Sequence, residues 1–204
     1  ISLVITSNHG FYGKINSELL TFFIVTTQKT ETDKICLGKT GIDYLKARAL
    51  KNFGEVVLKD DQPDPQELTN LVNSMADYNQ ILVFYPGMKS LLIQQPQVTD
   101  ITASSVAGSD VDLSKQDIQF IFEPEIAKIL QFFDSQVTTL LLEQTFLESE
   151  LARTASRFIS MDTAESEAND FIEDYLKIRN YAKRSLENNK ILENFASMAA
   201  IRKG

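Results

Sequence analysis

The segment after Pro124 constrains the fold of this chain more than any other part of it. It contains no further proline, and its only glycine is the last residue, Gly204. Proline and glycine are the residues that most disfavour a helix interior, so the segment is predicted to be helical. One early break near Asp134 is the alternative. At 1.5 Å per residue, a helix from Val137 to Ala200 would be roughly 95 Å long.

A heptad pattern of apolar residues runs along this predicted helix. With position a on Val137, the a and d positions are Val137, Leu140, Gln144, Leu147, Leu151, Thr154, Phe158, Met161, Glu165, Ala168, Ile172, Tyr175, Arg179, Ala182, Leu186, Asn189, Glu193 and Ala196. Twelve of these eighteen residues are apolar, which predicts a continuous stripe of the coiled-coil type. A folded domain of this chain length has a radius of gyration of about 17 Å, so the helix is expected to project from it. A second helix must then cover the stripe, supplied by another chain or by residues upstream of Ile1.

The first half of the chain alternates short apolar runs with amphipathic segments. The predicted strands are residues 1–6, 34–37, 55–58 and 80–85, and the predicted helices are residues 15–27, 42–51 and 66–78. Such alternation is typical of an α/β domain with a largely parallel sheet covered by helices on both faces. Edge strands at 91–93 and 97–101, an exposed loop at 103–116 and a strand at 118–122 follow, which makes the sheet mixed. The predicted domains are residues 1–123 and 124–204.

Local residues refine this prediction at three places. Asn16 or Ser17 is available to cap the first helix, and Asp64 before Pro65 favours a helix start. Pro96 is typical of an edge strand. The segment 38–41 is predicted to be a turn that closes the second strand.

The composition excludes several classes of function. The 204 residues carry 20 basic and 28 acidic side chains, a net charge of −8, which argues against a nucleic-acid partner. Cys36 and His9 are the only residues of their types, which excludes an internal disulfide and a cysteine-built zinc site. No apolar run approaches the roughly 20 residues that span a bilayer, so no direct membrane insertion is expected.

The sequence offers weak matches to sites for ligands or catalysis, and a structural role is favoured for each. Residues 38–40, Gly-Lys-Thr, resemble the end of a phosphate-binding loop, but Asp33 stands where that motif needs a glycine. His9 and Cys36 could form a thiolate–imidazole pair, although a cysteine inside an apolar strand is more often an inert buried thiol.

Two further patterns carry the same double interpretation. Asp60, Asp61 and Asp64 could gather a hard cation, but a solvated loop is favoured. Gly10 and Gly13 lack the leading glycine of a dinucleotide fingerprint. The sequence therefore predicts no catalytic residue, no cofactor and no metal, and a protein that acts as a scaffold.

Charge is distributed unevenly along the predicted long helix. Six acids and no bases lie between Asp162 and Asp174, and the bases Lys177, Arg179, Lys183 and Arg184 follow. A solvated helix face is one interpretation. A basic collar directed at an acidic partner is the other.

Several stretches, in order along nearly the whole chain, resemble the gamma subunit of rotary ATP synthases. Residues 4–16 are similar to that family's first strand and its Thr-Ser-Asp, Gly-Leu-Cys-Gly turn, and residues 38–41 to its Gly-Lys-x-Gly. Residues 120–124 resemble an aromatic-x-aromatic-Glu-Pro segment. Residues 152–164 and 179–184 resemble two helical motifs of the family.

The resemblance implies a central-stalk rotor in which an α/β foot carries a shaft of two antiparallel helices. The N-terminal helix of that pair would precede Ile1. The implied partners are the alpha and beta subunits of the catalytic head, the epsilon subunit and the membrane ring. The implied foot contacts with the ring and epsilon are Phe120, Phe122 and Glu123. The implied contacts of the shaft with the head are Asn180, Lys183, Arg184, Asn188 and Lys190.

The same resemblance implies a non-catalytic subunit that couples proton flow to ATP synthesis or hydrolysis. Its place would be peripheral, on the cytoplasmic side of an energy-transducing membrane such as the bacterial inner membrane. Two alternatives remain open at this point. The first is a gamma-like paralogue that serves as an adaptor or regulator, and the second is a nucleotide-binding or catalytic protein of the doubly wound type.

Overall fold

Five strands form one mixed sheet in the computed structural model of the chain, which describes residues 1–50, 52–59, 63–102 and 125–202. The strands are β1 (Ser2–Ile5), β2 (Lys34–Leu37), β3 (Gly54–Val56), β4 (Leu82–Ser90) and β5 (Ile93–Asp100). Their order in the sheet is β3-β2-β1-β4-β5. The first four are parallel to their neighbours, and β5 runs antiparallel to β4. The predicted α/β class with a largely parallel, mixed sheet is confirmed.

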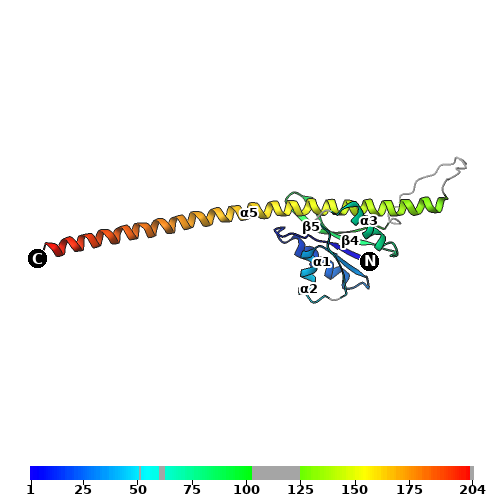
Figure 1. Ribbon diagram of the computed structural model, residues 1–204, viewed down its shortest axis with the longest axis horizontal. Helices are drawn as coiled ribbons and strands as arrows, with labels where there is room; N and C mark the ends of the chain where they lie inside the picture. Colours follow the sequence, from blue (N-terminus) through cyan, green and yellow to red (C-terminus); the bar gives the residue numbers. More distant parts are fainter. Residues whose placement is uncertain (51, 60–62, 103–124, 203–204) are drawn as a thin grey trace. The chain divides into compact units, whose positions relative to one another are not determined.

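Helices cover both faces of this sheet (Figure 1). On one face α3 (Pro65–Ser74) and the first half of α5 (Ile126–Ile201) pack against Leu3 and Ile5 of β1. On the other face α1 (Ile15–Thr27) and α2 (Lys39–Ala47) pack around Val4. Alternate residues of a strand point to opposite faces, so the apolar run of β1 contributes to both cores.

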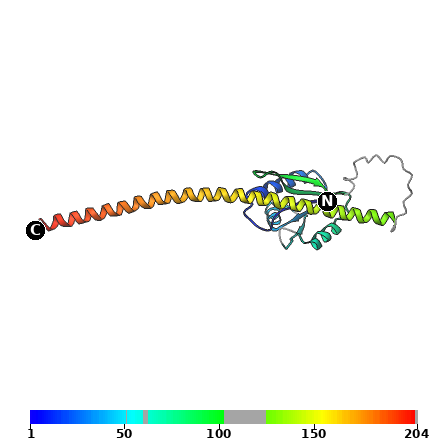
Figure 2. The same ribbon diagram turned by 90° about the horizontal axis from the view of Figure 1, so that it is seen from above.

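Helix α5 is continuous from Ile126 to Ile201, so the alternative of a break near Asp134 is wrong. The predicted long C-terminal helix, which Figure 2 shows from a second direction, is confirmed. By its contacts the chain divides into two compact units, Ile1–Ile159 and Ser160–Gly204. The first half of α5 belongs to the α/β unit because it is packed on the sheet. The predicted boundary at residue 123 lies outside the described residues.

The start of α2 differs from the prediction, because the helix begins at Lys39 and the segment 38–41 is not a closing turn. The first amide groups of a helix lack hydrogen-bond acceptors inside it. Here the loop after β1 supplies these acceptors. The amides of Lys39, Thr40 and Gly41 donate to Asn8 Oδ1, the Ser7 carbonyl and Thr6 Oγ1, each over 3.1 Å. Gly38 permits the entry into the helix with a φ of 97°.

Some of the remaining boundaries agree with the prediction and others do not: α2 and α3 end at Ala47 and Ser74, earlier than predicted, and β4 continues to Ser90. The helix at 15–27 and the strand at 34–37 agree residue for residue. The prediction of Asn16 or Ser17 as a cap is wrong, because Lys14 occupies that position without a side-chain cap and the Asn16 amide instead donates to Ser7 Oγ.

The two predicted edge strands are one strand, β5, preceded by the turn at residues 91–92. Pro96 lies on that strand at the edge of the sheet, opposite Pro86. The predicted loop at 103–116 and strand at 118–122 lie outside the described residues.

The helix start predicted at Asp64 is confirmed, and it supports a stability prediction. Asp64 and Glu67 form a reciprocal capping box, with Pro65 at the first helical position. Replacing a capping aspartate by alanine usually costs about 1 kcal/mol. We expect Asp64→Ala to lower the free energy of unfolding by about that amount in urea titrations. Thr69→Ala, on the same helix away from its start, is the control, and an equal loss in both variants would contradict the capping role.

Candidate interaction surfaces

One face of the first half of α5 is buried against the sheet. Its buried residues recur every three or four positions, as one side of a helix does. They are Thr138, Leu142, Thr145, Phe146, Ser149, Ala152, Arg153, Ala155 and Ser156. Leu142 and Phe146 join the apolar core around β1. The other members are mostly small or polar, so the helix lies close to the backbone of the α/β unit.

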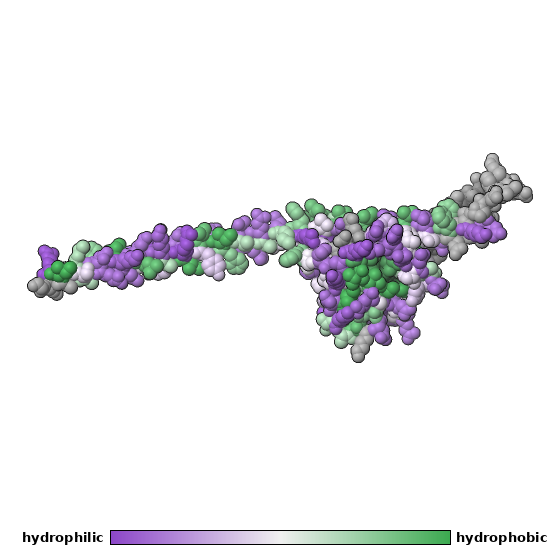
Figure 3. All heavy atoms as spheres, viewed as in Figure 1, coloured by the Kyte–Doolittle hydropathy of each residue, from purple (hydrophilic) through white to green (hydrophobic). Residues whose placement is uncertain are grey.

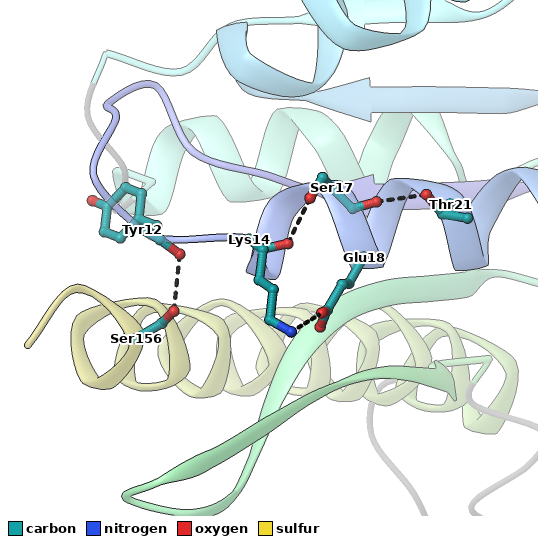
Figure 4. A network of polar contacts seen from close by, with 6 residues as sticks. All are labelled: Tyr12, Lys14, Ser17, Glu18, Thr21 and Ser156. Atoms are coloured by element: carbon teal, nitrogen blue, oxygen red, sulfur yellow. Dashed lines mark hydrogen bonds and ion pairs between the residues drawn. The ribbon is translucent and has the colours of Figure 1, made fainter. Parts of the chain in front are cut away.

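Polar contacts fix this face of α5 at specific points. Arg153 Nη1 donates to the Thr6 carbonyl over 2.8 Å, and Ser156 Oγ donates to the Tyr12 carbonyl over 2.9 Å (Figure 4). Nearer the start of the helix, Tyr85 donates its hydroxyl to Glu148 Oε2 over 3.2 Å. Burial together with the nearby Glu148 carboxylate raises the pKa of Tyr85, so the phenol stays protonated and able to donate this bond.

Two arginines of α5 meet one aromatic ring. The guanidinium carbons of Arg157 and Arg153 lie 4.3 and 6.0 Å from the centre of the Tyr12 ring. A cation at such distances is attracted to the face of the ring. The loop that carries Tyr12, between β1 and α1, is therefore held to α5 through both its backbone and its side chain.

The opposite face of the same part of α5 carries an exposed apolar stripe. Leu140, Leu147, Leu151 and Phe158 are 54%, 55%, 52% and 66% exposed. Their spacing of seven, four and seven residues matches the predicted a and d positions. We call these four residues the exposed stripe. Helix α5 therefore has two candidate contact faces here, and the α/β unit covers only one of them.

The unit Ser160–Gly204 has no buried face of its own in the described residues. Every residue from 161 to 199 is exposed. Figure 3 shows hydrophobic side chains along this helix among hydrophilic ones. The large apolar ones are Met161, Phe171, Ile172, Tyr175, Leu176, Ile178, Tyr181, Leu186, Ile191, Leu192, Phe195, Met198 and Ile201. An exposed apolar surface of this extent marks an interaction site.

The predicted head-contact residues all lie in this second unit. Asn180, Lys183, Arg184, Asn188 and Lys190 are exposed on α5 within eleven consecutive residues. Just before them, Lys177 pairs with Glu173 and Asp174. Hydrogen bonds to Glu173 and then Asp174 raise the pKa of Lys177. The predicted foot contacts Phe120, Phe122 and Glu123 lie outside the described residues.

The possible thiolate–imidazole pair has no support in the structure. Cys36 is fully buried, whereas His9 is exposed. Burial raises the pKa of the Cys36 thiol from 9.0 to about 12, which the hydrogen bond from Thr6 only partly offsets. The thiol is therefore protonated and inert at neutral pH, as the apolar strand around it indicates.

We expect Cys36 to react about 1,000-fold more slowly with a thiol reagent at pH 8 in the folded chain than in denaturant, because only the thiolate reacts. A raised pKa also favours folding below pH 9.0, and that contribution is lost as the pH rises towards about 12. The absorbance of the thiolate that a disulfide reagent releases measures the reaction rate of Cys36 in the folded chain and in denaturant. Lys29→Cys, at an exposed bend, provides the fast control, and equal rates for the two cysteines would contradict this account.

The other motif matches also have structural roles in the residues that are described. Lys39 and Thr40 belong to α2 and are held by the loop after β1. Asp64 caps α3, and Asp60 and Asp61 lie outside the described residues. Within the described ranges, no three His, Cys, Asp or Glu side chains gather as metal ligands would.

The carboxyl ends of the strands, where open α/β sheets commonly bind ligands, lie partly under α5. A cleft of about 660 Å³ at this edge is lined by both signs of charge. Its bases are Lys59, Arg153 and Arg157, and its acids are Asp64, Glu67 and Glu150. Equal numbers of the two give no excess of positive charge for a phosphate group.

Comparison with known proteins places this arrangement in a family. Residues 1–201 match the family model described as ATP synthase. The chain belongs to that family. Its curated relatives include the ATP synthase gamma chains of Staphylococcus saprophyticus, 23% identical, and Staphylococcus haemolyticus, 25% identical. Each match covers 98% of this chain and 73% of the relative. The chain is thus a homologue of ATP synthase gamma chains.

Solved ATP synthases contain chains with the same fold. A chain of the Euglena gracilis mitochondrial enzyme matches with a TM-score of 0.74 at 16% identity, over all of this chain and 73% of the other. A chain from the central stalk and ring of the Tetrahymena thermophila mitochondrial enzyme matches with a TM-score of 0.64 at 15% identity, over 80% of this chain and 75% of the other. The resemblance inferred from the sequence is therefore confirmed.

None of the helices in the described ranges combines the length and the hydropathy needed to cross a bilayer.

Proposed function

We propose that this ATP synthase gamma homologue is the rotor that transmits torque between a membrane ring and a catalytic head, and that it catalyses nothing itself. One observation supports this most strongly. The long helix α5 is anchored to the α/β unit by one face and exposes apolar residues on the opposite face of its first half. A self-contained enzyme does not need such a stripe. A shaft helix needs one surface that packs on the α/β foot and another that packs on a second helix.

The partner of the exposed stripe is a second long helix in a coiled coil. The spacing of the stripe suits knobs-into-holes packing, because a and d residues return to one side at every heptad. The predicted source of that helix, upstream of Ile1, stays a prediction. The same pairing would continue along the predicted a and d positions in the second unit, including Ile172, Tyr175 and Leu186.

The contacts with the other subunits are those that the resemblance to gamma subunits implies. The alpha and beta subunits of the head meet Asn180, Lys183, Arg184, Asn188 and Lys190, where bases are dense enough to face an acidic surface. The ring and the epsilon subunit meet Phe120, Phe122 and Glu123. The foot then lies at the cytoplasmic side of an energy-transducing membrane, and proton flow through the ring drives ATP synthesis.

Co-expression of the native protein with its cognate alpha and beta subunits tests the rotor role. We expect a complex that contains the chain and hydrolyses ATP, isolated by size-exclusion chromatography. A chain that never enters this complex would remove the rotor role. A chain that binds the complex without being needed for its ATP hydrolysis would instead indicate an adaptor or regulator related to gamma chains.

A further inference from the structure

We propose that Arg153 and Ser156 form a latch that transmits torque between the α/β foot and the shaft helix of this chain. This inference rests on the proposed rotor function. It names the residues that carry the torque from the foot to the shaft helix inside the subunit. Both residues lie in the unit Ile1–Ile159, on the buried face of α5.

The first part of the latch, Arg153, binds the end of the central strand of the sheet, β1. Arg153 is 1% exposed and is among the largest fully buried side chains in the described residues. Its Nη1 donates to the carbonyl of Thr6, the residue that follows β1. A hydrogen bond from a charged donor is roughly twice as strong as one between neutral groups. The contact therefore joins α5 to the sheet by a strong directional bond.

Thr6 is itself tied into the sheet, so a force on Arg153 reaches more than one strand. Its amide donates to the Leu37 carbonyl over 2.9 Å, and its hydroxyl donates to the same carbonyl over 2.5 Å. The Gly41 amide in turn donates to the Thr6 hydroxyl over 3.1 Å. The end of β1, the end of β2 and the start of α2 are thus one bonded unit at the point that Arg153 holds.

The second part of the latch lies one helical turn further along α5. Ser156 donates to the Tyr12 carbonyl, as the close-up in Figure 4 shows. Tyr12 lies in the loop between β1 and α1, and the start of α1 after it is braced by the 3.0 Å ion pair of Lys14 with Glu18. Two contacts on successive turns resist sliding and rolling of the helix.

Apolar packing alone would resist such movement poorly. Leu142 and Phe146 hold the helix on the core, but apolar contact is not directional. A hydrogen bond depends strongly on distance and angle. Shear between helix and sheet is therefore opposed by the latch, together with the Tyr85–Glu148 hydrogen bond and the contact of Arg157 with the Tyr12 ring. We expect its loss to leave the fold intact while the shaft slips or twists under load.

The test uses the complete ATP synthase with the native chain in sealed vesicles, and compares Arg153→Met with Leu45→Ala. Methionine keeps an apolar stem and removes the guanidinium. Leu45 is fully buried on the other face of the sheet, so its truncation lowers stability without touching α5. Proton uptake per ATP hydrolysed is measured against the ATPase rate of the same vesicles, and hydrogen exchange reports opening of residues 138–156.

We expect Arg153→Met to retain most of the ATPase rate and to lose at least about half of its proton uptake per ATP. Hydrogen exchange at 138–156 should rise about tenfold, as loss of a charged hydrogen bond implies. Leu45→Ala should keep normal proton uptake per ATP, and Arg153→Lys should recover part of it.

Normal coupling in Arg153→Met, or an equal loss in Leu45→Ala, would overturn the latch. If Arg153→Met does not assemble, Ser156→Ala takes its place. Its proton uptake per ATP and its hydrogen exchange at residues 138–156 are then measured. Failure of the unmodified chain to enter the complex would instead overturn the rotor function itself.

Discussion

Replacing Leu147 and Phe158 by aspartate should abolish pairing of α5 with its partner helix while leaving the isolated α/β unit folded. Both side chains are more than half exposed in this chain, so aspartate at either position stays solvated in the absence of a partner. In the paired state each carboxylate would be buried without a counter-charge, which costs about 3 kcal/mol or more. Such a cost corresponds to at least about a 100-fold loss of affinity for each substitution.

Assembly of the native protein into the complex is the measurement, together with urea unfolding of the chain alone. Ser166→Asp is the control, because Ser166 is exposed on the same helix and lies off the predicted a and d positions. We expect the control to assemble normally. Assembly of Leu147→Asp with Phe158→Asp at wild-type yield would show that no helix covers the exposed stripe.

Replacing Lys183 and Arg184 by glutamate should lower the affinity of the chain for the alpha and beta subunits of the catalytic head. Both residues are exposed on α5, and the bases here follow a segment with six acids and no bases. Loss of charge pairs that are desolvated in a complex usually costs about 2 to 5 kcal/mol. We therefore expect at least about a 30-fold weaker association with the alpha and beta subunits.

The control reverses the same number of charges in the α/β unit, with Lys29→Glu and Lys39→Glu, which are also exposed. Association is measured at two salt concentrations, because an electrostatic contact weakens as salt screens it. The wild-type chain should lose affinity as salt rises, and the Lys183→Glu, Arg184→Glu chain should be less sensitive. Equal affinity of the wild-type chain, the Lys183→Glu, Arg184→Glu chain and the control would contradict the contact. It would show that residues 183–184 lie on a solvated helix face.

Periodicity in the sequence predicted one side of α5 and missed the other. The heptad frame on Val137 found the stripe, because leucine and phenylalanine recur there at a and d. The face that packs on the sheet holds the apolar Leu142 and Phe146 but is otherwise built largely from small or polar residues, among them the buried Arg153. Small and polar residues at those positions resemble a solvated surface, and only the nearby backbone of the α/β unit makes them an interface.

The sheet was predictable because short apolar runs and helix starts alternate at regular spacing. The strand at 34–37 and the capped start of α3 depend on local residues, and both agree with the structure. The start of α2 depends on the loop after β1, more than thirty residues away, whose oxygen atoms accept from its first amides. Long-range contacts of this kind leave no pattern in the local sequence.

Rotation of the foot relative to a fixed head tests the rotor role most directly. The buried Cys36 is inert, so Lys29→Cys provides a single reactive thiol on the α/β unit for an optical probe. With the catalytic head immobilised and ATP added, we expect the probe to rotate continuously in one direction. A complex that contains the chain and hydrolyses ATP while the probe stays still would contradict the account.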